Sequence, residues 1–250
     1  MGKIKVIAYS PIHYGAEYLK ESLMSVINHV DKIVAVYSET PSYGHGTTAE
    51  CPEKEMDLFK IAMDVCGDKL IWRKEKFHNE GEHRSFIYNF TEGFDLVLAL
   101  DADEVFKEAD GELDNALRVA YEGDKRYYGI AGYLNFWKSF SHICTDGFTP
   151  IRITNLKNKS GEGVVPCTIY HFSCAQSNVI MDYKYEIHGH KNEIRDNWLQ
   201  NIYYKWTPEN QFKFLHPTSM DIWGEAIPFD KNTLPESLKN HPNFNKHIII

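Results

Sequence analysis

Three carboxylates lie directly after the most apolar strand-like run of the chain. Residues 96–100 form the continuous apolar stretch that a buried central strand needs, and Asp101, Asp103 and Glu104 follow at once. In open α/β sheets, ligands bind beyond the carboxyl ends of the strands. Crowded carboxylates repel one another unless a cation neutralises them, and Mg²⁺ or Mn²⁺ prefers hard oxygen ligands. The sequence therefore predicts a divalent-cation site; the alternative is that one Asp caps a helix and the others are solvated.

A regular alternation of strand and helix patterns must position these carboxylates. Runs of β-branched residues alternate with segments whose apolar residues recur at helical spacing, which is typical of a parallel sheet flanked by helices. The expected strands of the first half are 4–9, 32–37, 70–72 and 96–100, and the expected helices are 17–30, 56–66, 83–90 and 113–121.

The second half of the chain reads as further strands followed by irregular helical structure. We expect strands at 127–137, 151–154 and 164–172, helix within 179–206, and a short helix near 235–239. The short connections between these strands favour antiparallel pairing. The expected fold is therefore α/β, with a mixed, mainly parallel sheet flanked by helices and an irregular helical C-terminal part. We expect a catalytic domain over residues 1–190 and an extension over residues 191–250 packed on it.

The charge of the chain is concentrated near the carboxylates. The 250 residues include 27 basic and 35 acidic side chains, a net charge of -8, which disfavours general binding to phosphate backbones. Twelve acidic and three basic residues lie between Glu75 and Asp114, so the excess is local. This concentration supports a cation site and weakens the objection to a nucleic-acid acceptor.

Two classes of protein are disfavoured by other patterns. No apolar run approaches the roughly 20 residues that a membrane-spanning helix needs, and no signal peptide precedes the first strand pattern. The five cysteines form no Cys-x-x-Cys pair, so neither a disulfide framework nor a zinc knuckle is indicated. We expect a cytoplasmic protein.

Several segments, taken in order, resemble the family 2 glycosyltransferases of the GT-A fold. The sequence Asp101-Ala102-Asp103 is placed like the Asp-x-Asp motif of that family, at the end of a buried strand. The resemblance covers residues 3–190, and each of its motifs alone is a weak signal. The other similar segments are 7–11 and 17–23 (opening strand and helix), 30–37 (second strand), 79–85 (a helix start with an arginine beside the nucleotide) and 169–172 (a strand with a histidine).

The resemblance implies a metal-dependent transfer of a sugar from a nucleoside diphosphate donor, most commonly a UDP-sugar, to an acceptor hydroxyl. It makes Asp101 and Asp103 the expected catalytic residues, with Mn²⁺ or Mg²⁺ as cofactor. Asp103 is then a direct metal ligand, Asp101 contacts the ribose or the metal's hydration shell, and His171 is a further metal ligand. The implied donor contacts are Ser10, Pro11, Glu17, Glu39, Arg84, Asp101 and Ala102. Glu39 stands near the place where the family usually has an Asp.

Several alternatives stay open at this level. The acceptor is a glycan, a protein, a small molecule or a hydroxymethylated base of viral DNA. An inverting reaction needs a carboxylate base, for which Asp146, Glu162 and Asp182 are candidates, and retention is equally compatible. A nucleotide- or cation-binding protein without catalysis is a further alternative. Asp-nucleophile phosphatases place their Asp-x-Asp after the first strand, whereas three strand–helix units precede the motif here.

Overall fold

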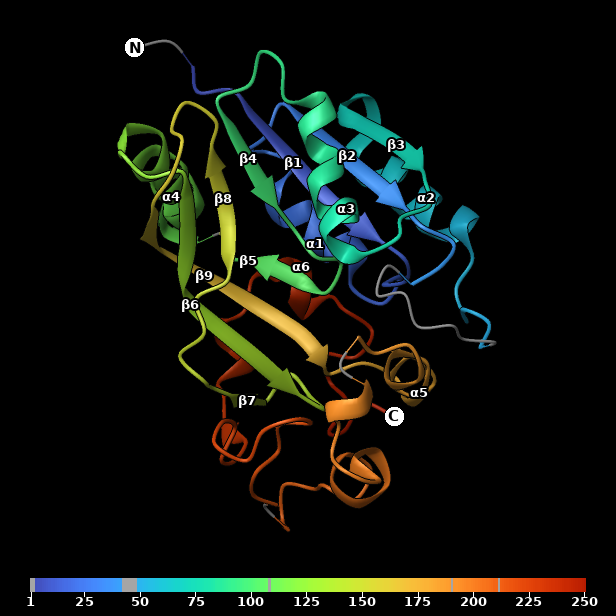
Figure 1. Cartoon of the computed structure of the whole chain (residues 1–250). Coiled ribbons are helices and arrows are strands. Elements are labelled where there is room, and N and C mark those ends of the chain that lie inside the picture. Colours follow the sequence, from blue (N-terminus) through green and yellow to red (C-terminus); the bar gives the residue numbers. More distant parts are fainter. Residues whose placement is uncertain (1–2, 42–48, 108, 190, 211) are drawn as a thin grey trace. The chain divides into compact units, whose positions relative to one another are not determined.

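The computed structural model describes residues 3–41, 49–107, 109–189, 191–210 and 212–250 (Figure 1). The chain divides into two compact units. The first takes the described residues within Met1–Gly44, Glu53–Tyr133 and Thr149–Tyr170, and the second those within His45–Pro52, Leu134–Phe148 and His171–Ile250. This division differs from the expected boundary at residue 190, because the chain passes between the units within two long strands, β6 (Tyr127–Trp137) and β9 (Glu162–Cys174).

Four parallel strands form one edge of the sheet in the first unit, in the order β3-β2-β1-β4. Strand β8 lies antiparallel beside β4, and β6 lies antiparallel beside β8. The short strand β5 pairs with β9. Besides β6 and β9, the strands named here are β1 (Val6–Ile12), β2 (Lys32–Tyr37), β3 (Leu70–Lys74), β4 (Leu96–Ala99), β5 (Glu104–Phe106) and β8 (Ile151–Asn155).

Alternation along the central strands explains why helices cover both faces of this sheet. Val6, Ala8 and Ile12 of β1 are buried in one cluster with residues of α1, α2 and α4. The intervening Ile7 and Tyr9 are buried on the opposite face, beside the segment that follows α3. Side chains of a strand point alternately to its two faces, so a strand that is apolar throughout must be covered twice. The helices of this unit are α1 (Leu19–Val26), α2 (Glu55–Cys66), α3 (Glu80–Ser85) and α4 (Glu112–Glu122), with 3-10 turns at Gly67–Lys69, Phe86–Phe90 and Ala109–Gly111.

The second unit is built around a core of aromatic side chains. Trp137, Trp198, Tyr203 and Trp206 are almost completely buried in it. Its strands β7 (His142–Cys144) and β10 (Ile227–Pro228) pair antiparallel, and β7 also pairs with the end of β6. Its helices are α5 (Asn178–Glu186) and α6 (Glu236–Lys239), with 3-10 turns at Lys191–Glu193 and Lys231–Thr233 and a π-helical turn at Leu199–Tyr203.

The structure confirms the expected α/β class, with a mixed sheet that is parallel at one edge, and it corrects two local expectations. The segment 179–206 is helical only in α5 and two short turns, and Asn197 has a left-handed φ of 53°, which a continuous helix does not allow. Glu104 begins strand β5 with a completely buried side chain, so it is not one of the solvated carboxylates of the alternative prediction.

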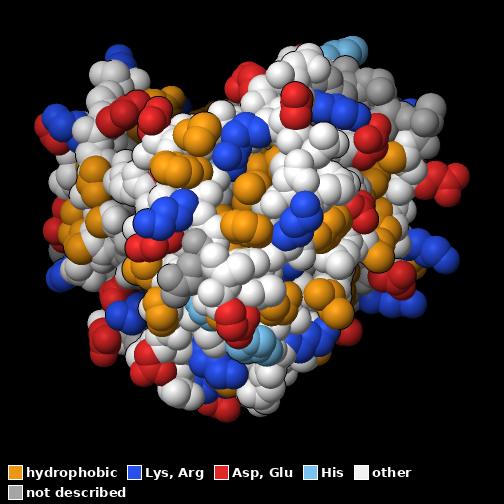
Figure 2. Space-filling view, turned by 90° about the horizontal axis from the view of Figure 1, so that it is seen from below, with side chains coloured by type: hydrophobic (Ala, Val, Ile, Leu, Met, Phe, Trp, Pro, Cys, Tyr) orange, Lys and Arg blue, Asp and Glu red, His pale blue; other side chains and the backbone are white. Residues whose placement is uncertain are grey.

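The surface shows no extended area of a single charge on the face drawn in Figure 2. Lys and Arg side chains alternate there with Asp and Glu, and hydrophobic side chains lie between them, as far as the described residues are concerned. Such a mixed surface is unlike the basic tracts that bind nucleic-acid backbones without sequence preference. Over the described ranges, every helix is too short or too polar to cross a membrane.

Candidate active site

Asp101 lies where the order of the parallel strands reverses. Strand β1 has β2 on one side and β4 on the other, and the crevice beyond the carboxyl ends of such neighbours is the usual ligand site of an open α/β sheet. The backbone continues the pairing just past β4, because Leu100 N donates to Tyr9 O at 2.9 Å. Asp101 follows immediately, and its carbonyl accepts a hydrogen bond from Ser22 Oγ of α1 at 3.1 Å. The predicted acidic motif is therefore at the predicted edge.

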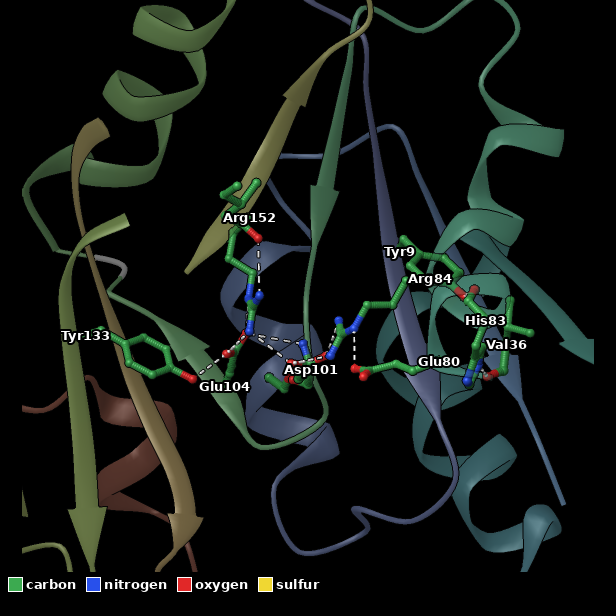
Figure 3. A network of polar contacts seen from close by, with 11 residues as sticks. Tyr9, Val36, Glu80, His83, Arg84, Asp101, Glu104, Tyr133 and Arg152 are labelled. Atoms are coloured by element: carbon green, nitrogen blue, oxygen red, sulfur yellow. Dashed lines mark hydrogen bonds and ion pairs between the residues drawn. The ribbon is translucent and has the colours of Figure 1, made fainter. Parts of the chain in front are cut away.

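Arg84 of α3 is paired with Asp101 through both carboxylate oxygens. Its Nη1 and Nη2 atoms lie 3.1 and 3.3 Å from Asp101 Oδ1 and Oδ2. Its Nε donates to Glu80 Oε1 at 2.6 Å, one helical turn earlier. The helix begins at this place because Asn79 caps it, its Oδ1 accepting from Glu82 N at 2.9 Å. Figure 3 shows the guanidinium of Arg84 pointing toward Asp101 from α3.

Arg152 approaches Asp101 from the other side, on strand β8. Its Nη2 lies 2.9 Å from Asp101 Oδ2 and 2.5 Å from Glu104 Oε1, and its Nε lies 2.7 Å from Glu104 Oε2. The Glu104 side chain is completely buried, and Tyr133 OH donates to its Oε1 at 2.8 Å. The result is one continuous network, in the order Glu80, Arg84, Asp101, Arg152, Glu104 and Tyr133 (Figure 3).

The network shifts the pKa values of Arg84, Arg152 and Tyr133. The Asp101 carboxylate raises the pKa of Arg84, and for Arg152 the pairing with Glu104 and Asp101 outweighs burial and raises the pKa as well. Burial, reinforced by the charge of Glu104, raises the pKa of Tyr133. Both guanidinium groups therefore stay charged and Tyr133 stays a hydrogen-bond donor.

The loop after β1 packs tightly against the acidic turn. Gly15 has a φ of 136°, and a Cβ atom there would lie 2.5 Å from the Cβ of Ala102. The amides of Gly15 and Ala16 donate to one carboxylate oxygen, Glu53 Oε2, at 2.6 and 2.9 Å. Burial raises the pKa of Glu53. Glu53 was not singled out in the sequence, and no local pattern connects it with a loop 38 residues earlier.

The other expected donor contacts differ in exposure, and Glu39 lies outside the network of Asp101. Ser10 is fully buried, and its hydroxyl has no hydrogen-bond partner among the described residues; Pro11 follows it in β1, half-buried. Glu17 is half-buried in the loop before α1. Glu39 is exposed after β2 and forms an ion pair with Lys74, outside the network of Asp101. Of the expected contacts, the network thus brings together Arg84 and Asp101.

His171 belongs to the second unit, where its ring is oriented by an amide. Its Nδ1 lies 2.7 Å from Asn135 Oδ1, while Asn135 Nδ2 donates to Asp146 Oδ2 at 3.4 Å. A carboxylate only accepts, so the amide nitrogen must face Asp146 and the amide oxygen must face His171. The amide oxygen only accepts, so His171 Nδ1 carries a proton.

The three candidate bases differ in their surroundings. Asp146 is half-buried and its carboxylate also accepts from Trp223 Nε1 at 2.8 Å. Asp182 is exposed and accepts from the hydroxyl of Tyr204. Glu162 is exposed at the start of β9. Of these three, Asp146 is the carboxylate held most firmly in place.

The acidic turn fits a divalent ion only in part. The described residues include no group of three or more His, Cys, Asp or Glu side chains arranged to hold a metal ion. Both oxygens of Asp101 already accept from guanidinium groups. Mg²⁺ is often held by one or two carboxylates together with substrate phosphates, without a full cage of protein ligands. Asp103, half-buried in the same turn, fits that arrangement.

Sequence reasoning missed Arg152, which is the centre of the network. A signal was present: Arg152 is a lone charge in the strand pattern Ile151–Thr154, and a charged side chain in a buried strand requires a partner. The sequence does not say which partner, because Asp101 is 51 residues away.

Comparisons with known proteins leave the family open. No protein-family model and no curated protein sequence matches this chain. Residues 1–349 of S. aureus TarS are 16% identical over 52% of this chain and 36% of that one, with a TM-score of 0.37. The 4-diphosphocytidyl-2C-methyl-D-erythritol synthase of Anaerococcus prevotii is 10% identical over 72% of this chain and 94% of that one, with a TM-score of 0.45. This chain thus spans about a third of the TarS fragment, and likenesses this weak say nothing about its activity.

Proposed function

We propose that this protein transfers a sugar from a nucleoside diphosphate sugar, with UDP as the expected nucleotide, to an acceptor hydroxyl. The observation that carries the proposal is the position of Asp101, at the strand-order reversal and between two arginines. The resemblance of the surrounding segments to family 2 glycosyltransferases supports the same reaction.

The two arginines are proposed to have different tasks. The Arg84 side chain is 40% exposed, so its guanidinium is within reach of a ligand in the crevice. Arg152 is 12% exposed and held by the buried Glu104, which makes it a positioning residue. We assign to Arg84 the stabilisation of the negative charge that grows on the leaving diphosphate, since charge-assisted bonds from a preoriented donor favour such a transition state. Asp101 keeps that guanidinium in place and is available to the donor ribose.

Asp103 is the proposed protein ligand of Mn²⁺ or Mg²⁺. A divalent ion would supply Lewis-acid stabilisation of the diphosphate and would help to orient the donor. His171, which the resemblance makes a further ligand, belongs to the second unit, and we propose no shared site for it with Asp103. Because the described residues lack a complete ligand group, we expect the ion to bind together with the nucleotide.

Calorimetry on the full chain tests the proposal. We expect UDP to bind more tightly with Mn²⁺ than without it, and Mn²⁺ alone to bind weakly. Asp103→Ala should abolish the gain from Mn²⁺ and the transfer of sugar from UDP-sugars. Asp124→Ala, at an exposed aspartate in the turn after α4, is the matched control. It should leave the gain in UDP affinity from Mn²⁺ and the transfer of sugar unchanged.

Two results would contradict the proposal. If no nucleotide binds in either condition, or if Asp103→Ala keeps full transfer activity, the assignment of the site is wrong. Tight nucleotide binding without hydrolysis or transfer, tested over glycan, peptide and hydroxymethylated DNA acceptors, would instead indicate a binding protein without catalysis.

A further inference from the structure

The second unit contains a pocket that is lined by Asp146, one of the candidate bases, and by four residues that have no role so far. Its volume is about 450 Å³, within the range of small-molecule sites, and its lining is Asp146, Gly147, Phe148, His216 and Ile222. Phe148 is 58% exposed, so its aromatic ring is within reach of a ligand in the pocket.

Two segments that are hydrogen-bonded to each other, one containing His216 and the other Ile222, form one wall of this pocket. Phe214 N donates to Gly224 O at 2.7 Å, and Leu215 N donates to Trp223 O at 2.8 Å, so His216 and Ile222 are held on neighbouring stretches. Phe214 and Trp223 have left-handed φ values of 59° and 54°, and a residue other than glycine in this conformation costs about 1 kcal/mol or more. The surrounding packing maintains that strain, so the wall is preformed.

The polar groups of the pocket are fixed in defined roles. His216 Nδ1 accepts from the amides of Thr218 and Ser219 at 3.3 and 3.2 Å. Its proton is therefore on Nε2, and burial lowers its pKa, so the ring is a neutral donor.

Asp146 is fixed as an acceptor. It receives bonds from Trp223 Nε1 and Asn135 Nδ2 at Oδ2 and from Phe148 N at Oδ1, the last at 2.8 Å. A carboxylate has about four acceptor positions, so this count leaves one position at Oδ1 for a ligand.

We propose that this pocket binds a neutral, hydroxylated ring, namely a sugar residue of the acceptor. The identification of this sugar as part of the acceptor rests on the function proposed above. A sugar hydroxyl donates to Asp146, another accepts from His216, and the apolar C–H face of the ring packs on Phe148. An anionic ligand is disfavoured, because Asp146 supplies a negative charge and the neutral His216 does not offset it.

Saturation-transfer NMR on the full chain tests this inference without any donor. The probes are the methyl glycosides of glucose, galactose and N-acetylglucosamine. We expect saturation transfer to the ring C–H protons of at least one of them. Phe148→Ala should weaken that binding about tenfold, the factor that corresponds to about 1.4 kcal/mol for a lost aromatic contact. Val179→Ala, at a similarly exposed apolar residue on α5, is the control and should bind as the wild type does.

The outcomes separate this inference from the proposed function. Absence of transfer to all three glycosides overturns the inference, and so does equal binding by Phe148→Ala. Tetramethylammonium is a further probe, and preferential binding of this cation would show a cation site instead of a sugar site. UDP binding, measured separately, should be the same in Phe148→Ala and the wild type. Sugar binding without nucleotide binding would therefore contradict the proposed function alone.

Discussion

Arg152 shows how one side chain changes the meaning of a sequence motif. The acidic turn after β4 suggests a cation site, because three adjacent carboxylates repel one another. In the structure, the guanidinium of Arg152 neutralises Glu104 and shares Asp101 with Arg84. The two arginines thus supply much of the positive charge that a cation was expected to supply near Asp101. Asp103 remains as the proposed metal ligand.

Removing the Arg152 guanidinium should destabilise the fold strongly. Arg152→Met leaves the charge of the buried Glu104 uncompensated, which typically costs about 3–5 kcal/mol in the free energy of unfolding. Urea denaturation measures this loss. Adding Glu104→Gln to Arg152→Met should restore a large part of the stability, and additive losses would mean that the two residues do not form a coupled pair.

Arg84 should matter for ligand binding far more than for stability. The Arg84 side chain is 40% exposed, so its ion pair with Asp101 is expected to contribute less than about 1 kcal/mol to the free energy of unfolding. Arg84→Lys retains the charge but loses the planar fork, so we expect UDP affinity to fall about tenfold while the urea midpoint changes little. Arg118→Lys, at an exposed arginine of α4, is the matched control. Unchanged UDP affinity in Arg84→Lys would remove Arg84 from the donor site.

At the scale of elements, the site depends on how closely two turns approach. The loop after β1 and the turn after β4 come from neighbouring parallel strands, and Gly15 lets them touch at Ala102. Glu53 holds that loop by accepting from two consecutive amides. Such a contact needs a residue without Cβ, because the added atom would lie inside the contact distance.

Gly15→Ala should therefore displace the acidic turn. The new Cβ would lie 2.5 Å from the Cβ of Ala102, so steric displacement adds to the cost of an unfavourable φ, and we expect a loss of about 2 kcal/mol or more. Gly67→Ala is the control, because Gly67 also has a positive φ of 48° but nothing lies within 4 Å of an added Cβ. Thermal unfolding measures the loss of stability, and UDP calorimetry measures the effect of the displaced acidic turn on nucleotide binding. Equal losses in both variants would show that the contact with Ala102 is unimportant.

At the scale of the molecule, partly or fully buried histidines in both units link stability to pH. The pKa values of His13, His83, His142 and His216 are lowered, in each case chiefly by burial. The folded chain then binds fewer protons than the unfolded chain below the ordinary histidine pKa of 6.5. Folding therefore favours the neutral form of these histidines, and their protonation in acid opposes folding.

The stability should accordingly fall as the pH falls through 6.5 toward the lowered pKa values of the folded state, and it should be restored above 6.5. Urea unfolding at a series of pH values across this window measures the slope. His83→Gln should reduce that slope, since one of the four groups no longer titrates, whatever its effect on stability at pH 7. A stability that rises on acidification through this window would contradict the assignment.

The sequence by itself determined most strands and helices of the first unit and the edge of the sheet where the candidate site lies. Continuous apolar runs and apolar positions at a spacing of 3.6 residues are local properties, and strand β2, which is buried almost throughout, follows from such a run directly. Asp101 comes directly after the run at 96–99, so the sequence already places it at the carboxyl end of a buried strand.

Only the tertiary structure decided which groups meet there. Arg152 and Tyr133 reach Glu104 from strands 48 and 29 residues away, and Glu53 reaches the Gly15 amide across 38 residues. These pairings depend on strand register and loop path, which no local pattern encodes. The same holds for Asp146 and His216, which share a pocket although 70 residues separate them in the sequence. A motif therefore located the candidate site, while long-range contacts set the charges and hydrogen bonds that define it.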